Sequence, residues 1–429
     1  MSLLKQRLEN LLPPLIEDIR RFVKENANKV VSEVTLAQAY GGLRGVKSLV
    51  CDTSEVPPES GLIIRGIELK YLWSKLPEEI LWLLLTGELP NAAELKDLQD
   101  ELKSREEVPV YVWKVIDSMP DDSHPMAMFS TGILVMQHES KFAKAYNDGV
   151  KKPDYWKSTL EDALDILAKL PAIGAYVYRR RFNKGPRIES DKNADWSQNY
   201  VHILSLEDPK GEFSKLMRLY LTLHCDHEGG NVSAFSAATI NSALSDLYYS
   251  LSGGLNGLSG PLHGLANQEC LKWVLETMDK FGGAPSEKEL EQFAWDTLNS
   301  GKVIPGYGHA VLRVTDPRFD AFLDFGKQYM AEDPVFQTVA RVFDVVPNVL
   351  RQVKKIKDPW PNVDAGSGAL LYHYGMKEFS YYTVLFSISR ALGICSQGVI
   401  TRAYGLPIIR PKSLPTEKYK DLVAEKHFV

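Results

Sequence analysis

Four histidines lie in short segments that also contain glycine or acidic residues, a setting in which an imidazole can meet a ligand. The segments are His224-Cys-Asp-His-Glu-Gly-Gly230, which holds His224 and His227, Gly260-Pro-Leu-His-Gly264, which holds His263, and Pro305-Gly-Tyr-Gly-His309. Glycine has no side chain that blocks the approach of backbone and imidazole to a ligand. A histidine alone is more often a hydrogen-bonded core or turn residue, so both interpretations stay open for each of the four.

The pair His224 and His227 would also allow a metal site, because Asp226 and Glu228 lie beside it. The spacing of the pair differs from the HExxH pattern of zinc enzymes, however, and no third ligand follows at a familiar interval. We therefore expect no bound metal.

Arg390 continues a mostly aromatic stripe at helical spacing, formed by Phe379, Tyr382 and Phe386. Burial of a guanidinium without an anionic partner is costly, so either a carboxylate of the chain or an anionic ligand should meet it. The sequence leaves these two alternatives open.

Other basic residues could bind carboxylates or phosphates. Arg313 and Arg318 follow His309, and Arg410 lies near the C-terminus. Several arginines with histidines would suit a small dicarboxylate, because a guanidinium binds a carboxylate through two parallel hydrogen bonds. Phosphates could be met by Arg44, Lys47, Lys355 and Lys357, although a solvated surface is the simpler interpretation of each.

Asp364 lies in the turn-like segment Trp360-Pro-Asn-Val-Asp-Ala-Gly366, which is poor in other charges. Its carboxylate could act as a general base if partial burial raised its pKa. The alternative is a helix N-cap, a position that aspartate occupies very commonly.

Helical periodicity dominates the elements that must position these residues. Apolar residues repeat at helical spacing in the segments 3–15, 81–85, 95–102, 160–170, 216–223, 287–298 and 321–330. Alternating apolar runs are few, and 49–52 and 62–65 are the expected strands. The composition changes near 261–264 and again near 359–368. We expect a nearly all-α protein in which a smaller domain is inserted between these junctions, with a hinge at each.

Composition excludes several classes of protein. The 429 residues carry a net charge of −5, so no general basic field favours nucleic acid. The four cysteines form no CxxC pair, which fits a reducing compartment. The uncharged stretch 247–268 is broken by glycines, and we expect a buried glycine-rich turn and no membrane span. The acidic residues among the first 21 are unlike a targeting peptide, so the N-terminus does not reveal localisation.

Taken in order, the motifs resemble the citrate synthase family, in its eukaryotic mitochondrial branch. They are Tyr40-Gly-Gly-Leu-Arg-Gly-Val-Lys47, Leu83-Leu-Leu-Thr-Gly87, Leu167-Ala-Lys-Leu-Pro171, Asp226-His-Glu-Gly-Gly-Asn-Val-Ser233, Gly260-Pro-Leu-His-Gly-Leu-Ala-Asn-Gln-Glu269, Pro305-Gly-Tyr-Gly-His-Ala-Val-Leu-Arg313, Asn362-Val-Asp364, Ser389-Arg-Ala-Leu-Gly393 and Arg410-Pro-Lys-Ser413. The resemblance implies an all-α homodimer. Its large domain would comprise residues 1–265 and 370–429, its small domain residues 266–369, and closure around oxaloacetate would form the acetyl-CoA site.

The resemblance also implies the roles of individual residues. Asp364 would remove a proton from the acetyl methyl group, His263 would stabilise the resulting enol or enolate, and His309 would polarise the oxaloacetate carbonyl. Oxaloacetate would be held by His227, His309, Arg318, Arg390 and Arg410, the last from the neighbouring subunit. CoA would contact Arg44, Lys152, Val303, Gly306, Tyr307, Arg313, Lys355 and Asn362.

The resemblance implies no metal or redox cofactor, and acetyl-CoA counts as a substrate. The expected partners are oxaloacetate, acetyl-CoA and a second copy of the chain, and the resemblance places the protein in the mitochondrial matrix. Gly366 and Phe235 stand where close relatives usually have histidine. Two alternatives remain, namely a 2-methylcitrate synthase, which uses propionyl-CoA through the same residues, and a structural or filament-forming protein on the same scaffold. One methyl group gives only about 1–3 kcal/mol of discrimination.

Overall fold

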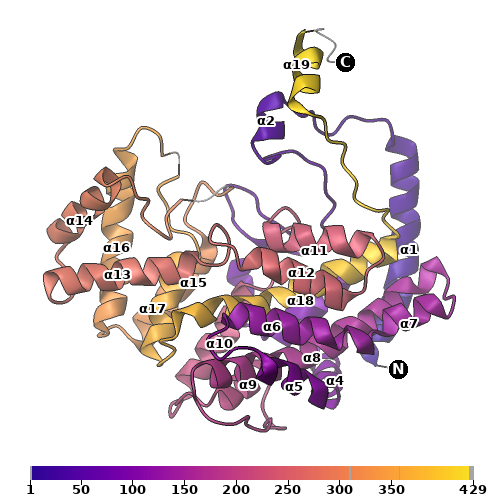
Figure 1. Cartoon of the computed structure of the whole chain (residues 1–429), viewed down its shortest axis with the longest axis horizontal. Helices are drawn as coiled ribbons and strands as arrows, with labels where there is room; N and C mark the ends of the chain where they lie inside the picture. The colour runs from indigo at the N-terminus through magenta and orange to yellow at the C-terminus, as the bar shows by residue number, and fades with distance from the viewer. Residues whose placement is uncertain (1, 309–310, 357, 425–429) are drawn as a thin grey trace.

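The computed structural model describes residues 2–308, 311–356 and 358–424, and it is helical almost throughout (Figure 1). Three short antiparallel strands form its sheet, namely β1 (Ser54–Glu55), β2 (Ile63–Ile64) and β3 (Ile67–Glu68). The expected all-α class is therefore confirmed. The strand expected at 62–65 is present as β2, but the one expected at 49–52 is wrong. The chain becomes a strand only at Ser54, where Ile64 lies opposite as its partner.

One long helix, α18 (Tyr382–Tyr404), forms the centre of the larger part of the molecule, and nearly all of its residues are buried. The helices packed around it include α3 (Pro77–Thr86), α6 (Pro125–Val135), α8 (Tyr155–Arg181), α10 (Glu212–Leu223), α11 (Val232–Ser242) and α12 (Leu247–Leu258). By length and composition the segment Phe379–Tyr404 could cross a membrane, but its apolar window is wholly buried inside the protein. It is the core helix of this part.

Four more helices complete the larger part: α4 (Ala92–Ser104), α5 (Val110–Ser118), α7 (Lys141–Asn147) and α9 (Trp196–Leu204). The glycine-rich turn expected at 247–268 is present only at 259–264, and the prediction is wrong for the first half of this stretch, which α12 occupies. A Cβ atom on Gly254 would lie 2.7 Å from the Ser233 carbonyl oxygen and 2.9 Å from the Ala237 Cβ. The glycines here thus allow α11 and α12 to pack closely.

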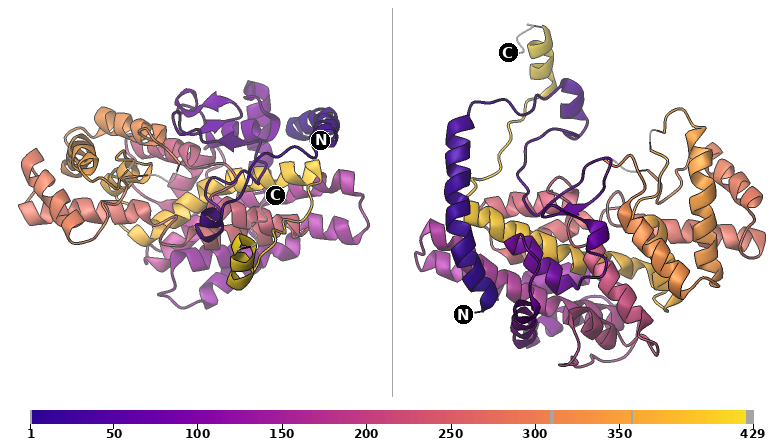
Figure 2. Two further views of the ribbon diagram at one scale, coloured as in Figure 1. Left: turned by 90° about the horizontal axis from the view of Figure 1, so that it is seen from above. Right: turned by 180° about the vertical axis from the view of Figure 1, so that it is seen from behind.

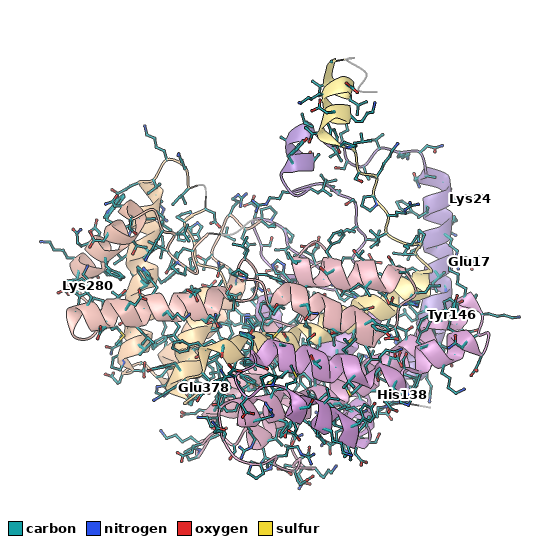
Figure 3. All side chains as sticks on the ribbon, viewed as in Figure 1. Glu17, Lys24, His138, Tyr146, Lys280 and Glu378 are labelled. Atoms are coloured by element: carbon teal, nitrogen blue, oxygen red, sulfur yellow. The ribbon has the colours of Figure 1, made fainter. Side chains whose placement is uncertain are left out.

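The smaller part lies at one end of the molecule (Figure 1). It consists of α13 (Ala266–Phe281), α14 (Glu287–Asn299), α15 (Pro317–Tyr329), α16 (Pro334–Arg351) and α17 (Asp364–His373), which pack on one another. Glu378, labelled in Figure 3, lies in the turn that returns the chain from α17 to α18. It accepts a hydrogen bond from the Tyr178 hydroxyl at 2.6 Å and pairs with Lys184 at 2.7 Å. This turn is therefore anchored to the larger part.

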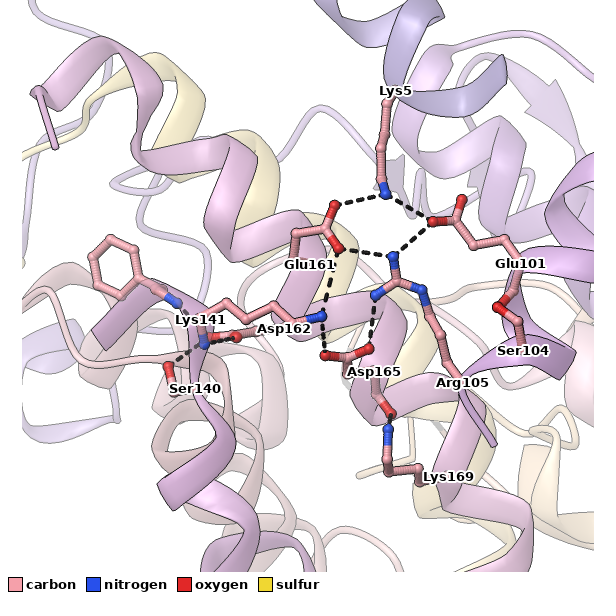
Figure 4. Close-up of polar contacts among 11 residues, drawn as sticks. Lys5, Glu101, Ser104, Arg105, Ser140, Lys141, Glu161, Asp162, Asp165 and Lys169 are labelled. Atoms are coloured by element: carbon pink, nitrogen blue, oxygen red, sulfur yellow. Dashed lines mark hydrogen bonds and ion pairs between the residues drawn. The ribbon is translucent and has the colours of Figure 1, made fainter. Parts of the chain in front are cut away.

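The N-terminal helix α1 (Leu3–Asn26) is fixed to the larger part by three fully buried leucines and an ion-pair network. Figure 4 shows Lys5 between Glu101 and Glu161, and Arg105 in contact with both carboxylates and with Asp165. After α1 the chain extends away from the body to α2 (Leu36–Tyr40), which meets the C-terminal helix α19 (Thr416–Ala424) (Figure 2).

Candidate active site

His263 lies in the turn between α12 and α13, where its ring is held by the start of α11. The backbone N–H of Ser233 donates to Nε2 of His263 at 3.3 Å, and the Ser233 hydroxyl lies 3.0 Å from the same atom. A backbone N–H can only donate, so Nε2 is an acceptor and the neutral ring carries its proton on Nδ1. Burial, with Arg390 nearby, lowers the pKa of His263 to about 4. The imidazole is therefore a neutral hydrogen-bond donor at neutral pH.

Asp364 is the first residue of α17, and the N-cap position before it belongs to Val363. The alternative that Asp364 serves as the N-cap is therefore wrong. Its backbone N–H donates to Oδ1 of Asn362 at 2.9 Å. Burial raises the pKa of the Asp364 carboxyl to about 7, against the opposing effect of Arg318. A carboxyl with this pKa has the proton affinity that a general base needs near neutral pH.

Arg390 comes from the middle of α18, and its side chain is 2% exposed. Its guanidinium donates to the His224 carbonyl oxygen at 3.1 Å, to Oδ1 of Asn231 at 3.2 Å and to the Ser233 hydroxyl at 3.4 Å. Within the described residues these hydrogen bonds all go to neutral acceptors. Of the two alternatives, this arrangement favours an anionic ligand over a local ion pair. Burial lowers the pKa of Arg390 to about 10, so it remains a cation at neutral pH.

Arg318, from α15, is also buried but is paired with a carboxylate. Its Nη2 lies 2.6 Å from Oδ2 of Asp316, and its Nε lies 3.0 Å from Oδ1. The two arginines of the site therefore differ, because among the residues that the structure describes a carboxylate is bound to the guanidinium of Arg318 but not to that of Arg390. Arg390 affects the pKa of both His263 and Asp364, and Arg318 that of Asp364. These four groups thus share one electrostatic neighbourhood.

The two histidines of the first segment differ in their surroundings. His224 is a core histidine: Nδ1 bonds the Tyr220 carbonyl oxygen at 3.0 Å, its ring stacks on that of Tyr220, and burial lowers its pKa to about 3. His227 is almost fully buried and follows the buried Asp226. Among the described residues no group of three or more His, Cys, Asp or Glu side chains could hold a metal ion.

A glycine-rich loop of the smaller part lies directly against the start of α17. The Asn362 backbone N–H donates to the Gly306 carbonyl oxygen at 2.9 Å, and Nδ2 of Asn362 donates to that of Gly308 at 3.1 Å. Gly306 has φ +79°, and a Cβ atom there would lie 2.9 Å from Cα of Ala365. The structure thus brings Gly306, Tyr307 and Asn362 next to Asp364. His309, the next residue in the sequence, lies outside the described residues.

The remaining expected ligand residues divide into two groups. Val303 and Lys355 are exposed on the smaller part, and the backbone N–H of Arg313 bonds the Pro58 carbonyl oxygen at 2.9 Å. Lys152 and Arg410 instead lie near or beyond the C-terminal end of α18, since the Lys152 side chain reaches Gly405. Gly405 follows Arg390 by fifteen positions, about 22 Å at the rise of an α-helix. These two residues, like the exposed Arg44, are not gathered with the cluster around Asp364.

The structure also identifies neighbours that the sequence did not single out. Asn231 and Ser233 contact Arg390, and Ser233 contacts His263. Both lie inside the motif that begins at Asp226, so the signal was present, but their partners are distant in sequence.

Two residues, Gly366 and Phe235, stand where histidine was expected from the family resemblance. Gly366 lies in α17, where a Cβ atom would be 3.2 Å from the Phe319 ring, and Phe235 is a partly exposed residue of α11.

Comparisons with known proteins identify the family of the chain. The family described as "Citrate synthase, C-terminal domain" matches residues 42–412. The mitochondrial and peroxisomal citrate synthases of Saccharomyces cerevisiae are each 48% identical over 98% of this chain and over 89% and 93% of their own lengths. A protein of Yarrowia lipolytica named "2-methylcitrate synthase, mitochondrial" is 48% identical over 99% of the chain and 93% of its own length.

Solved structures give the same result for the fold. The crystal structure of citrate synthase from Pyrobaculum aerophilum matches with a TM-score of 0.78 and 27% identity, over 91% of this chain and 98% of that one. The family match covers well over half of the chain and includes every described residue of the cluster around Asp364. The chain therefore belongs to the citrate synthase family.

Proposed function

We propose that the chain condenses acetyl-CoA with oxaloacetate and water to give citrate and CoA, the first step of the tricarboxylic acid cycle. The observation that carries this proposal is the pairing of Asp364, a carboxyl with a pKa of about 7, with His263, a neutral imidazole donor, in one electrostatic neighbourhood. Proton removal next to a thioester carbonyl needs both a base and a donor for the oxygen that becomes negative.

Asp364 removes the proton from the acetyl methyl group in this account. A thioester α-proton is too weakly acidic for a carboxylate to remove in water, so the developing oxyanion must be stabilised as it forms. His263 donates its Nδ1–H to that oxygen, and the Ser233 N–H on Nε2 keeps the proton in place. The enol or enolate then attacks oxaloacetate, and hydrolysis of citryl-CoA completes the reaction.

Oxaloacetate binds to Arg390, Arg318, His227 and His309 in this proposal, with Arg410 from the partner. Arg390 is well suited to a substrate carboxylate because it is cationic, buried and bonded only to neutral acceptors. His309 polarises the ketone of oxaloacetate and acts as an acid during attack. The acyl-CoA lies along Gly306, Tyr307 and Asn362, where the absence of a side chain at Gly306 lets the loop approach α17.

The positions of Arg410 and Lys152 support a homodimer. The Lys152 side chain reaches Gly405, about 22 Å along α18 from Arg390, and Arg410 follows Gly405 in the chain, so we assign both to the site of the partner subunit. The extended segments that leave the body carry exposed apolar residues, among them Val30, Val31, Val50 and Ile408. A partner that covers these side chains would explain their exposure.

The small domain in this proposal is the part formed by α13 to α17, and it closes on the large domain about the junctions before α13 and after α17. Asp364 and the Gly306 loop belong to the small domain, whereas Arg390 and His227 belong to the large one. Because α17 runs on to His373, we place the second junction in the turn that contains Glu378. Closure would thus bring the base to the bound oxaloacetate.

No cofactor takes part in this reaction. We propose that the protein acts in the mitochondrial matrix. Imaging of the tagged product of the full coding sequence tests the location: overlap with a mitochondrial marker is expected, and overlap with a peroxisomal marker would contradict it.

Oxaloacetate-dependent release of free thiol tests the function, with acetyl-CoA and propionyl-CoA run in parallel. Faster release from acetyl-CoA is expected. Preference for propionyl-CoA would favour the methylcitrate reaction, and no release from either by a folded dimer would favour a scaffold role.

A further inference from the structure

A buried acid, Asp226, connects residues on both sides of the oxaloacetate site. Its side chain is 0% exposed and lies between β1, the turn that carries His227, and α18. The carboxylate accepts hydrogen bonds from the Thr53 hydroxyl at 2.6 Å, the Ser54 hydroxyl at 2.9 Å and Nε2 of Gln397 at 2.7 Å. These three donors are neutral, and burial raises the pKa of the Asp226 carboxyl above its usual range.

The same donors fix the backbone of the turn that carries His227. The Glu228 backbone N–H donates to the Ser54 hydroxyl at 2.8 Å, and Nε2 of Gln397 also reaches the Glu228 carbonyl oxygen at 3.3 Å. Glu228 has φ +43°, a conformation that side-chain-bearing residues rarely adopt. Such a backbone persists only when its surroundings hold it, and here Ser54 and Gln397, which donate hydrogen bonds to Asp226, do so.

Asp226 also lies directly on α18, the helix of Arg390. A Cβ atom on Gly393 would lie 2.5 Å from Oδ1 of Asp226, and the Gly393 backbone N–H donates to the Cys225 carbonyl oxygen at 3.0 Å. Glycine at 393 thus allows the carboxylate to approach the helix. Gln397 follows Arg390 by seven residues, so the two side chains leave α18 on the same face.

Asp226 and Arg390 are linked through α18, because Asp226 accepts a hydrogen bond from Gln397 on the helix face that carries Arg390. Burial lowers the pKa of Arg390, and Asp226 opposes that fall. In turn, Arg390 and the hydroxyl donors oppose the rise in the pKa of Asp226 that its burial causes. A contacting carboxylate, such as Asp316 on Arg318, would instead occupy the donors that a substrate needs.

We propose that Asp226 is a positioning residue of the oxaloacetate site: its hydrogen bonds to Thr53, Ser54 and Gln397 fix the turn that carries His227 against β1 and against α18, the helix of Arg390. The proposal rests on the proposed function, because it takes oxaloacetate as the ligand of Arg390. Other titratable or charged groups that influence the pair, or are influenced by it, are Arg318 from α15, Asp364 from α17, His224, Cys225 and Glu228 near the turn, His263 before α13, and Cys51 before β1.

Asp226→Asn keeps the shape of the side chain but replaces one acceptor oxygen by an amide nitrogen that cannot accept. At least one of the bonds from Thr53, Ser54 and Gln397 is then lost, so the turn that carries His227 should be held less firmly and the KM for oxaloacetate should rise about tenfold. The KM for acetyl-CoA at saturating oxaloacetate should change little.

Asp162→Asn is the matched control. Asp162 is also 0% exposed and accepts bonds from the Ser140 hydroxyl and from the backbone N–H groups of Lys141 and Phe142, but it lies away from the site. Its replacement should alter stability alone. An equal rise in the oxaloacetate KM for both variants, or no rise for Asp226→Asn, would overturn the proposal.

Thr53→Val keeps the proposal testable if Asp226→Asn does not fold. It removes the 2.6 Å donor and preserves side-chain volume, so the turn that carries His227 should be held less firmly and the KM for oxaloacetate should rise. A wild-type KM for this variant would contradict the positioning role of Asp226. Binding of oxaloacetate can be measured by calorimetry without turnover. If the wild-type chain binds oxaloacetate but releases no thiol, the proposed function is refuted. The affinity of the Asp226→Asn chain for oxaloacetate still tests the role of Asp226 in that case.

Discussion

Ser233 and His263 are joined through a backbone group, because the Ser233 N–H donates to Nε2 of the imidazole at 3.3 Å. Among replacements of Ser233, proline alone would remove this donor, so the start of α11 sets the tautomer of His263. The proton on Nδ1 is the one available to a ligand. With a pKa of about 4, the ring donates as a neutral group throughout the physiological range.

His263→Ala should lower kcat by about 10²- to 10³-fold, the effect of removing one donor to a developing oxyanion. Oxaloacetate affinity should stay near that of the wild type. In the wild-type chain the His263 ring should take up a second proton only near pH 4, as followed by its NMR resonance. Titration of this ring between pH 6 and 7 would contradict the neutral-donor role.

Gly306→Ala tests the close approach of the loop to α17. The added Cβ would meet Cα of Ala365 at 2.9 Å and would require a left-handed backbone, so the KM for acetyl-CoA should rise. Gly282→Ala is the control, since Gly282 also has positive φ but has open space around it. Both variants should lose about 1 kcal/mol or more of unfolding free energy, and only Gly306→Ala should alter the kinetics. A kinetic change shared by both would refute the assignment.

Arg105→Met tests the network that fixes α1. Arg105 contacts Glu101, Glu161 and Asp165, and its removal leaves three partly buried carboxylates with less compensation. The free energy of unfolding should fall by about 2–3 kcal/mol. Lys96→Met, which breaks the exposed pair with Asp100, should cost less than about 1 kcal/mol. Denaturant unfolding compares the two, and equal losses would show that the network adds nothing.

Subunit complementation tests whether Arg410 serves the active site of its own chain or that of the partner subunit. An Arg410→Ala chain and an Asp364→Asn chain should each be nearly inactive alone. In a mixed dimer, the Arg410→Ala chain keeps its own Asp364 and would receive Arg410 from its partner, so activity should return. Mixed dimers without activity would show that Arg410 serves the site of its own chain.

The sequence predicts the helices well because their apolar residues repeat clearly, as in α3, α4, α8, α10 and α14. It misses α12, since glycines that serve helix packing resemble turn residues. The types of the site residues could be predicted, and so could the neighbourhood of Asn362 and Asp364, which are close in sequence. The pairing of Thr53 with Asp226, 173 residues apart, could not, because no local pattern encodes it. The sequence also could not predict that, among the described residues, no carboxylate is hydrogen-bonded to Arg390.

The direct test of Asp364 as the base is the turnover of Asp364→Asn, followed as thiol release across pH, with oxaloacetate binding measured beside it. The pKa of Asp364 lies above its usual range, so wild-type turnover should fall as the pH drops through about 7. Burial of the ionised Asp364 carboxylate opposes folding at a pH above its raised pKa. The Asp364→Asn variant should therefore be no less stable than the wild type at that pH. The account predicts several orders of magnitude less turnover with oxaloacetate still bound; near-normal turnover, or an unchanged acid limb, would contradict it.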